Sequence, residues 1–492
     1  MAVNSLNPRE NRALHLCAAL FFIASPLLIM LILSALAGQN MFLAKPYLND
    51  EVDYWRLMYS VKECGLDFGP TGGLPGRNAP IGPLESHGLG PLAAWLWYAL
   101  CFPFTESALV IASFVMLTLA LLLFYLIVKP SDRQAILMAV FTMLFPPLVR
   151  YINLSMMEIP CYAAVIVYIA LLCRYEKSRS LSCLVLLLLS GLYCSLLRLS
   201  NVVLFFPAIL IFCDNRWSWK LLWCLLAYVL GVLLLNSFVN LFIAPYPDFV
   251  SSLSECASWK EVLLTLLRNL LGNLRNMLNP FSDHSLPQAV ARYYYLALVL
   301  FFLAASFFRV SASGLRLTWR WEYVGMLGVA AGSLALVLLL YDVFDWRDYR
   351  TLSPMAFVLV LWLLLRWPVE GRGFRAALAT LLVFGALMAP DSYRHAAQDD
   401  RFFDTGRTGA DYSQLFPSEP CTLGLYGDTY PLSLAMDVPP QVGISSGLYE
   451  GRPDCYGMDY VLSRAGDPIP SEEYFSPVGE MEDYGMLYKR KQ

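Results

Sequence analysis

Three carboxylates lie within four positions of one another directly after the first long apolar run. Asp50, Glu51 and Asp53 belong to the segment PYLNDEVDYW, residues 46–55. The segment predicts a helix that begins near Asp50, where an acidic residue caps the helix or faces a site. A carboxylate in such a place can take a proton from a hydroxyl group. Acidic residues at a helix start just outside a membrane are also common structural features, so both interpretations stand at this point.

Further ionisable side chains lie at the borders of later apolar runs. Glu158 opens a run in RYINLSMMEIPCY, where a carboxylate is costly unless it faces a cavity or a partner. Arg198 lies in SLLRLSNVVLFFPA, and Arg347 and Arg350 lie in YDVFDWRDYRTLSPM. Arginine favours bidentate contacts with phosphate, although each of the three can also extend toward lipid headgroups. His87 adds a polar group in the first long loop.

The composition indicates which elements must position these residues. Hydrophobic residues make up 58% of the 492 positions, charged residues make up 15%, and the mean hydropathy is +0.54. These values are typical of a polytopic helical membrane protein. We predict a mainly α-helical bundle of about eleven membrane spans, near residues 14–37, 108–128, 135–149, 159–173, 181–197, 201–213, 221–243, 293–308, 323–341, 352–366 and 376–389.

Short basic loops recur after every second apolar run, and they predict the orientation. By the positive-inside rule these loops lie on the cytoplasmic side together with the N-terminus. If the run Pro91 to Phe104 were a span, every later basic loop would lie on the external side. We therefore interpret this run as a re-entrant or juxtamembrane helix in an external loop, residues 38–107. The basic residues are Lys129/Arg133, Arg174/Lys177/Arg179, Arg216/Lys220, Arg309/Arg316/Arg320 and Arg366/Arg372/Arg375.

The composition changes at Pro390, where polar residues and turn signals replace the apolar runs. Residues 390–492 contain 17 Asp and Glu against eight Lys and Arg. We therefore divide the chain into a membrane module, residues 1–389, and a small exported α/β domain, residues 390–492. In an oxidising compartment Cys421 and Cys455 form a disulfide or remain two free thiols. The sequence contains no metal-type Cys or His spacing and no nucleotide-binding Gly motif, and it gives no sign of a nucleic-acid partner.

Four segments, in this order and spacing, resemble a known enzyme family. NDEVDYW, SMMEIPCYAAVIVYIALLCR, SGLYCSLLRLSNVVLFFPAILIF and RDYRTLSPMAFVLVLWLLL look like motifs of the C-type (GT-C fold) glycosyltransferases that use a polyprenyl-phosphate sugar. The resemblance is to the protein mannosyltransferase and lipid A aminoarabinose transferase branch, and it covers about residues 10–390. An exported C-terminal domain is also usual in that branch.

The resemblance implies roles for the carboxylates. The Asp-Glu pair of the family's first external loop matches Asp50 and Glu51, and the Asp is the catalytic carboxylate, with Asp53 a neighbour. Glu158 matches an acidic residue that the family uses near the same site, sometimes with a divalent metal ion. The family's Lys-Pro or Pro-Pro before the juxtamembrane helix is missing here, and ESHGLGP stands in its place, which makes His87 a candidate for that polar role.

The resemblance also implies ligands for the donor phosphate. Arg198 matches the basic residue of the family's L-T-K/R stretch. Arg350 matches the arginine of its R-Y-x-x-x-P stretch, although here Tyr349 precedes the arginine and Pro354 follows four residues later. Arg347, three residues earlier, is a further candidate for the phosphate.

Together these features predict an enzyme of the inner membrane whose site faces the periplasmic or external side. Its expected partners are a polyprenyl-phosphate-linked sugar, membrane lipids and an exported acceptor, which is a lipid such as lipid A, a polysaccharide or a protein. Transfer by a single displacement would invert the anomeric centre. Two alternatives remain: a transporter or flippase for a lipid-linked glycan, and a polysaccharide polymerase or ligase. The second alternative is compatible with the long loop 245–292, which contains the amphipathic segment EVLLTLLRNLLGNLRNML.

Overall fold

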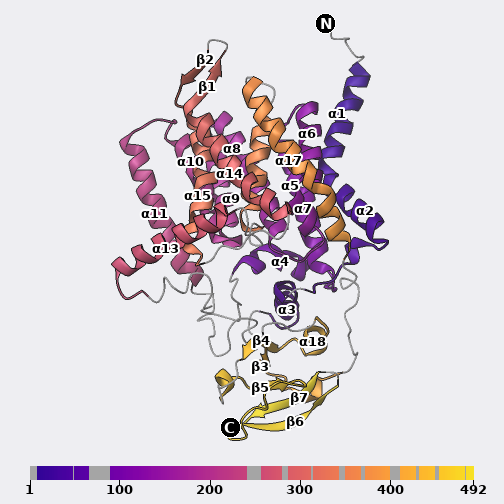
Figure 1. Ribbon diagram of the computed structural model, residues 1–492. Coiled ribbons are helices and arrows are strands. Elements are labelled where there is room, and N and C mark those ends of the chain that lie inside the picture. The colour runs from indigo at the N-terminus through magenta and orange to yellow at the C-terminus, as the bar shows by residue number, and fades with distance from the viewer. Residues whose placement is uncertain are drawn as a thin grey trace.

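The fold is a helical bundle with a small mixed sheet at one end, as seen in a computed structural model (Figure 1). The structure describes residues 8–47, 49–65, 89–240, 256–279, 286–311, 314–342, 350–366, 372–398, 411–427, 432–448, 454–482 and 484–491. The prediction of a mainly helical chain with a small C-terminal sheet is confirmed.

The helices of the bundle follow one another along most of the chain. The first half contains α1 (Pro8–Ile23), α2 (Ser25–Ala37), the 3-10 helix η1 (Met41–Leu43), α3 (Asn49–Cys64), α4 (Leu89–Cys101), α5 (Ala108–Val128), α6 (Asp132–Leu144), α7 (Pro146–Tyr151), α8 (Glu158–Ser178) and α9 (Leu181–Leu197). The second half contains η2 (Leu199–Leu204), α10 (Phe205–Phe212), α11 (Trp219–Asn240), α13 (Trp259–Leu278), α14 (Leu286–Phe307), the hairpin β1 (Phe308–Ser311) and β2 (Gly314–Leu317), α15 (Trp321–Leu340), α16 (Ser353–Leu365) and α17 (Arg372–Ala397).

Four of the described helices are long and apolar enough to cross a membrane: α5, α8, α11 and α15. The pair α1 and α2 would be a fifth span, but it is bent by 60°. Five other described apolar helical segments, α4, α9, η2–α10, α16 and the described part of α14, have between 10 and 17 residues. Helix length therefore supports four or five spans directly, and the number eleven stays a prediction.

Prolines account for the places where predicted spans are broken. Pro26 lies in the first turn of α2, next to the break between α1 and α2. Pro146 begins α7 after the predicted span 135–149 is interrupted at Phe145. A proline has no N–H to donate and favours the first turn of a new helix. The apolar run can therefore continue while the helix axis changes direction.

Helix α8 is the centre of the bundle. Within it, 83% of an 18-residue apolar window is buried, and α5, α9 and α16 pack against it. By contrast only 6% of the corresponding window of α11 is buried. The surface of α11 is therefore suited to contact lipid, while α8 is surrounded by protein.

The two ends of the bundle differ in what they carry. The N-terminus and the β1–β2 hairpin lie at one end, and α3, α4 and the C-terminal sheet lie at the other (Figure 1). We call the latter the α3 end. Helix α4, which contains most of Pro91 to Phe104, has 13 residues and packs against α3 and α9.

Helix α13 turns its polar face toward the protein. Asn269 and Asn273 are buried, and both donate hydrogen bonds to carbonyl oxygens at the C-terminal end of α15, including those of Leu339 and Leu338. Leucines on the opposite face of α13, such as Leu267, are exposed. The asparagines satisfy carbonyl groups that a helix end leaves without intrahelical donors, and the apolar face is suited to a membrane surface.

The C-terminal part is a five-stranded sheet with the strand order β4-β3-β5-β7-β6. Strand β3 pairs in parallel with β4 and with β5, whereas β5–β7 and β6–β7 are antiparallel. A parallel pair needs a crossover connection, and α18 provides it between β3 and β4. The elements are η5 (Ser413–Leu415), β3 (Cys421–Tyr426), α18 (Leu432–Asp437), β4 (Val442–Leu448), η6 (Cys455–Gly457), β5 (Tyr460–Ser463), β6 (Phe475–Met481) and β7 (Gly485–Arg490). The composition boundary at Pro390 falls inside α17, which continues to Ala397.

Cys421 and Cys455 are both free thiols. Cys421 begins β3, whereas the Cys455 sulfur lies 3.6 Å from the hydroxyl of Tyr426 at the other end of the same strand. The two ends of this six-residue strand are about 16 Å apart at the usual strand rise. Of the two alternatives that the sequence left open, the structure has the free thiols.

Candidate functional site

Four charged side chains from distant parts of the chain meet at the α3 end of the bundle. Arg350 Nη2 lies 3.4 Å from Asp50 Oδ2, and its Nε lies 4.0 Å from Glu158 Oε1. Arg198 Nη2 lies 3.1 Å from the same Glu158 oxygen. We call these four residues the charged cluster. Two carboxylates and two guanidinium groups thus form a continuous chain of ion pairs.

Helix ends position each member of the charged cluster. Asp50 and Glu158 lie in the first turns of α3 and α8, where the helix dipole favours a negative charge. Arg198 follows the last residue of α9 with an extended backbone, where the dipole favours a positive charge. Arg350 lies three residues before Ser353, the first residue of α16. The bundle therefore supplies a rigid frame, and the charges sit where its helices end.

The members of the charged cluster differ in exposure. The Glu158 side chain is 1% exposed, whereas those of Asp50, Arg198 and Arg350 are 21%, 23% and 29% exposed. A buried carboxylate is costly unless it is paired, and Arg198 supplies the charge that compensates Glu158. The other three side chains still reach the surface, so a ligand can contact them.

Two buried polar atoms of the cluster lack a hydrogen-bond partner among the described residues. They are Oε2 of Glu158 and Nη1 of Arg198. Buried polar atoms are nearly always paired in folded proteins, so exceptions next to ion pairs are candidates for contact with a ligand. An anionic oxygen can accept from Arg198 Nη1, and a hydroxyl can donate to Glu158 Oε2.

Arg350 remains a cation in this environment. Burial by itself lowers the pKa of its guanidinium, but the charges of Glu158 and then Asp50 act in the opposite direction, and the net result is a raised pKa. The backbone of Arg350 is also held, because the Tyr162 hydroxyl donates to Ser353 Oγ at 2.6 Å, which donates to the Arg350 carbonyl oxygen at 2.7 Å. Helix α8 thus fixes both the charge partner and the backbone of Arg350.

Glu51 is buried next to the loop that leads into α8. Its carboxylate accepts the backbone N–H of Ser155 at 2.5 Å and that of Tyr47 at 3.5 Å. Ser155 lies in the loop that leads into α8, three residues before Glu158. These two hydrogen bonds tie the start of α3 to the start of α8. The catalytic role of Glu51 stays a prediction.

Gly90 allows α4 to pack closely beside the cluster. A Cβ at this position would lie 2.8 Å from the carbonyl oxygen of Leu197 and 3.2 Å from the terminal methyl of Met157. These residues directly precede Arg198 and Glu158 in sequence. Any side chain at position 90 would therefore displace the segments that present the two paired charges.

Three further residues are predicted for the site: Asp53, His87 and Arg347. Asp53 is one turn further along α3 and is partly exposed. His87 and Arg347 lie outside the described residues, as does Tyr349. The sequence interpretation missed Gly90, Tyr162 and Ser353, because their roles depend on contacts between helices that are far apart in the chain.

The described residues do not suit a metal ion at Glu158. They contain no group of three or more His, Cys, Asp or Glu side chains that could hold one. The nearest charged neighbours of Glu158 are two guanidinium groups, which repel a metal cation and attract an anion. The donor set of the described cluster is thus suited to an anion such as phosphate.

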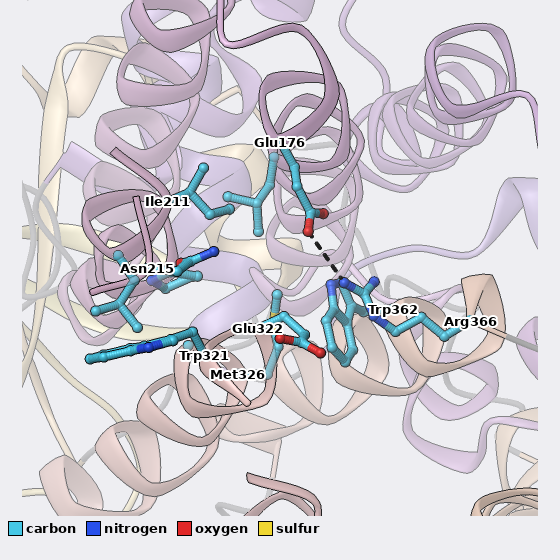
Figure 2. Close-up of a pocket in the computed structure, with 12 residues that line it drawn as sticks. Glu176, Ile211, Asn215, Trp321, Glu322, Met326, Trp362 and Arg366 are labelled. Atoms are coloured by element: carbon cyan, nitrogen blue, oxygen red, sulfur yellow. Dashed lines mark ion pairs between the residues drawn. The ribbon is translucent and has the colours of Figure 1, made fainter. Parts of the chain in front are cut away.

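A second pocket lies at the opposite end of the bundle (Figure 2). Its walls include Glu176 on α8 and Arg366 after α16, which are 3.6 Å apart. The Arg366 guanidinium also lies 3.6 Å from the ring centre of Trp362. Glu176 is 18 residues after Glu158, a distance of about 27 Å along α8 at the helical rise. This pocket is therefore separate from the charged cluster.

Comparison with known proteins gives structural neighbours only. No protein-family model matches the sequence, and no curated protein sequence is significantly similar to it. An oligosaccharyltransferase from Archaeoglobus fulgidus in complex with Zn and sulfate aligns over 97% of this chain and 73% of its own length, with 14% identity and a TM-score of 0.45.

Two further neighbours come from the same comparison. The oligosaccharyltransferase AglB from Archaeoglobus fulgidus, with an inhibitory peptide and a dolichol-phosphate, aligns over 96% of this chain and 74% of its own, with 13% identity and a TM-score of 0.41. ArnT from Cupriavidus metallidurans, bound to undecaprenyl phosphate, aligns over 95% of this chain and 97% of its own, with 13% identity and a TM-score of 0.40. These neighbours are GT-C glycosyltransferases, the group that the sequence motifs resemble. The roles assigned below rest on the side chains of this chain.

Proposed function

We propose that this protein is a membrane glycosyltransferase that moves a sugar from a polyprenyl-phosphate donor to an exported acceptor with inversion of the anomeric centre. The observation that carries the proposal is the charged cluster, because it places the partly exposed carboxylate of Asp50 beside Arg350 and links Arg350 to Arg198 through Glu158. The motifs that resemble the GT-C family supply the same residues in the same order. The acceptor is a lipid such as lipid A, a polysaccharide or a protein.

Arg198 and Arg350 bind the phosphate of the donor. The free Nη1 of Arg198 donates to one phosphate oxygen, and Arg350 donates to another, because guanidinium groups match the geometry of phosphate. Polyprenyl phosphate is the leaving group, and its negative charge increases as the bond to the sugar breaks. Two fixed cations stabilise that developing charge.

Asp50 is the general base. It accepts the proton of the acceptor hydroxyl while the hydroxyl oxygen forms a bond to the anomeric carbon and the bond from that carbon to the phosphate oxygen breaks. The bonding electrons leave with polyprenyl phosphate. Base and leaving group thus act on opposite sides of the carbon, which gives inversion.

The ion pair between Arg350 and Asp50 fits this order of events. A phosphate oxygen bound on the far side of the Arg350 guanidinium would lie more than about 6 Å from the Asp50 carboxylate, because the guanidinium lies between two contacts of hydrogen-bond length. That spacing leaves room for the anomeric carbon and the acceptor oxygen between them. Bound phosphate also competes with Asp50 for Arg350 and leaves the carboxylate available to the acceptor.

Glu158 and Glu51 support these groups without contacting the reacting carbon. Glu158 holds both guanidinium groups through one oxygen. Glu51 fixes the start of α3 to the loop before α8. A transporter for a lipid-linked glycan would be expected to place its charges near the middle of the membrane, whereas the cluster lies where helices begin and end, and this favours the transferase.

The proposal is tested by following both products of the purified wild-type protein. The protein is mixed with an α- or β-configured polyprenyl-phosphate sugar and with membranes that contain the acceptor. We expect polyprenyl phosphate to be released in step with the appearance of sugar on the acceptor, and NMR of the product should show the opposite anomeric configuration. Retained configuration would exclude single displacement, and movement of intact donor across the membrane without transfer would favour the transporter.

A further inference from the structure

A second cleft at the α3 end is separate from the charged cluster. It lies between α3, the loop that joins α4 to α5, the segment after η1, and α18 of the C-terminal part. Its volume is about 530 Å³, within the range of about 300–1,000 Å³ that is usual for ligand pockets. Its walls therefore come from both the bundle and the C-terminal part of the chain.

Aromatic rings form one wall of this cleft. The rings of Trp55 and Tyr59 are stacked with centroids 5.1 Å apart, and those of Tyr59 and Phe104 are stacked at 6.4 Å. The Trp55 indole N–H donates to the Thr105 carbonyl oxygen at 3.0 Å, which fixes α3 against the α4–α5 loop. The three rings form a compact aromatic group, because Trp55 and Phe104 also lie 5.7 Å apart. Trp55 is buried, so the half-buried rings of Tyr59 and Phe104 are the part that a ligand can reach.

An ion pair lines the cleft beside the rings. Lys45 Nζ lies 2.6 Å from Glu106 Oε2, and each side chain is 26% exposed. The hydroxyl-bearing residues Thr105 and Ser107 flank Glu106 on either side. The wall thus combines hydrogen-bond donors and acceptors with aromatic rings.

A buried arginine holds the two sides of the cleft together. Arg56 on α3 is 0% exposed and donates hydrogen bonds to the carbonyl oxygens of Ala435 and Val438 at 2.7 Å and of Val442 at 2.9 Å, and to that of Pro439. These carbonyls surround the end of α18, the helix that contributes Met436 to the cleft. The hydrogen bonds of Arg56 therefore hold α3 against the C-terminal part and fix the two sides of the cleft relative to each other.

The cleft and the charged cluster lie on opposite sides of α3. Tyr59 follows Asp50 by nine residues, which is two and a half helical turns and about 13 Å along the axis. A ligand in the cleft cannot place its bound unit next to Asp50. It can reach Asp50 only if it is an extended molecule that continues around the helix.

We infer that this cleft binds sugar units of an extended acceptor glycan, remote from the hydroxyl that reacts. The inference rests on the proposed transferase and names the acceptor as a saccharide. A pyranose ring presents a flat face of C–H groups that packs on aromatic rings, and its hydroxyls hydrogen-bond to groups such as Lys45 and Glu106. An acyl chain would instead cover that ion pair without offering hydrogen bonds in place of those from water, and burial of charges without such bonds is costly.

The test measures binding of a defined glycan fraction to the full-length protein in lipid nanodiscs. The probe is the water-soluble glycan released by mild acid from the envelope of cells that carry the gene, freed of lipid and protein. Calorimetry should show binding to wild type, a Kd raised about fivefold to tenfold by Phe104→Ala, and a Kd raised at least threefold by Glu106→Gln. Trp319→Ala is the matched control, since Trp319 packs edge-to-face against Trp321 at the opposite end of the bundle, and its Kd should stay within twofold of wild type.

The binding measurement separates this inference from the proposed reaction. It needs no donor and no turnover, so Asp50→Asn should bind the glycan with the wild-type Kd. Absence of binding to wild type, or equal Kd values for wild type, Phe104→Ala and Glu106→Gln, would overturn the saccharide site even if transfer is observed. Binding with the expected losses supports it, even if Asp50→Asn were to retain full turnover and the catalytic role of Asp50 were lost.

Discussion

Replacement of Arg350 by lysine tests how the donor phosphate is held. The guanidinium uses separate nitrogens for its two partners, Nη2 for Asp50 and Nε for Glu158. A lysine keeps the charge, but its single nitrogen cannot reproduce this fork or bind phosphate through two donors. We expect a loss of one charge-assisted hydrogen bond to the donor, about 1.5–3 kcal/mol, which corresponds to about 10- to 150-fold in kcat/KM.

The assay is the initial rate of polyprenyl-phosphate release by purified protein in nanodiscs at several donor concentrations. The control is Arg366→Lys, because Arg366 also pairs with a glutamate but lies at the other end of the bundle. Its kcat/KM should stay within about twofold of wild type. Equal kinetics for Arg350→Lys and wild type, at equal protein abundance, would remove Arg350 from the phosphate site and leave Arg198 as its ligand.

Three further predictions concern the frame around the cluster and the C-terminal sheet. Glu51→Gln should lower both the melting temperature and the transfer rate, because an amide offers only one acceptor oxygen to two backbone N–H groups. The control Glu63→Gln, on the exposed part of α3, should change neither. Equal melting temperatures for Glu51→Gln and wild type would contradict the positioning role. Gly90→Ala should reduce transfer severalfold, because its Cβ meets a backbone carbonyl at 2.8 Å, whereas Gly231→Ala meets nothing within 4 Å and should be neutral. Burial, with a nearby carboxylate, raises the pKa of the Cys421 thiol to about 12. At pH 8 the thiolate form is therefore scarce, and alkylation of Cys421 should be slow until the protein is denatured. Rapid alkylation of Cys421 in the native protein, measured by mass spectrometry, would contradict this.

Part of this arrangement could be predicted from the sequence because it depends on local patterns. The apolar runs at 108–128 and 181–197 are α5 and α9 with the expected bounds. Asp50, Glu158, Arg198 and Arg350 stood out because each is a charge at the border of an apolar run, where burial has to be compensated. The structure brings the four charges together in ion pairs, and their common function stays a prediction.

The rest depends on contacts that no local pattern shows. Glu51 has the same type and neighbourhood as Asp50, yet its partner is a backbone N–H more than 100 residues away. The bend between α1 and α2 occurs inside one apolar run, and Pro26 was its only local signal. No local pattern marks Arg56 as a buried residue, because its partners are carbonyl groups around α18, nearly 400 residues away.

The central claim is that Asp50 takes the proton of the acceptor, and one comparison tests it most directly. Asp50→Asn keeps the shape of the side chain and removes its charge, and a general base contributes about 10²- to 10⁴-fold to the rate. The matched control is Asp214→Asn, since Asp214 is an exposed carboxylate with a positive φ of 57° that asparagine also adopts. Sugar transfer from purified polyprenyl-phosphate donor should fall by at least 100-fold in Asp50→Asn, with donor binding and melting temperature near wild type, and should be unchanged in Asp214→Asn. Full turnover by Asp50→Asn would contradict the account.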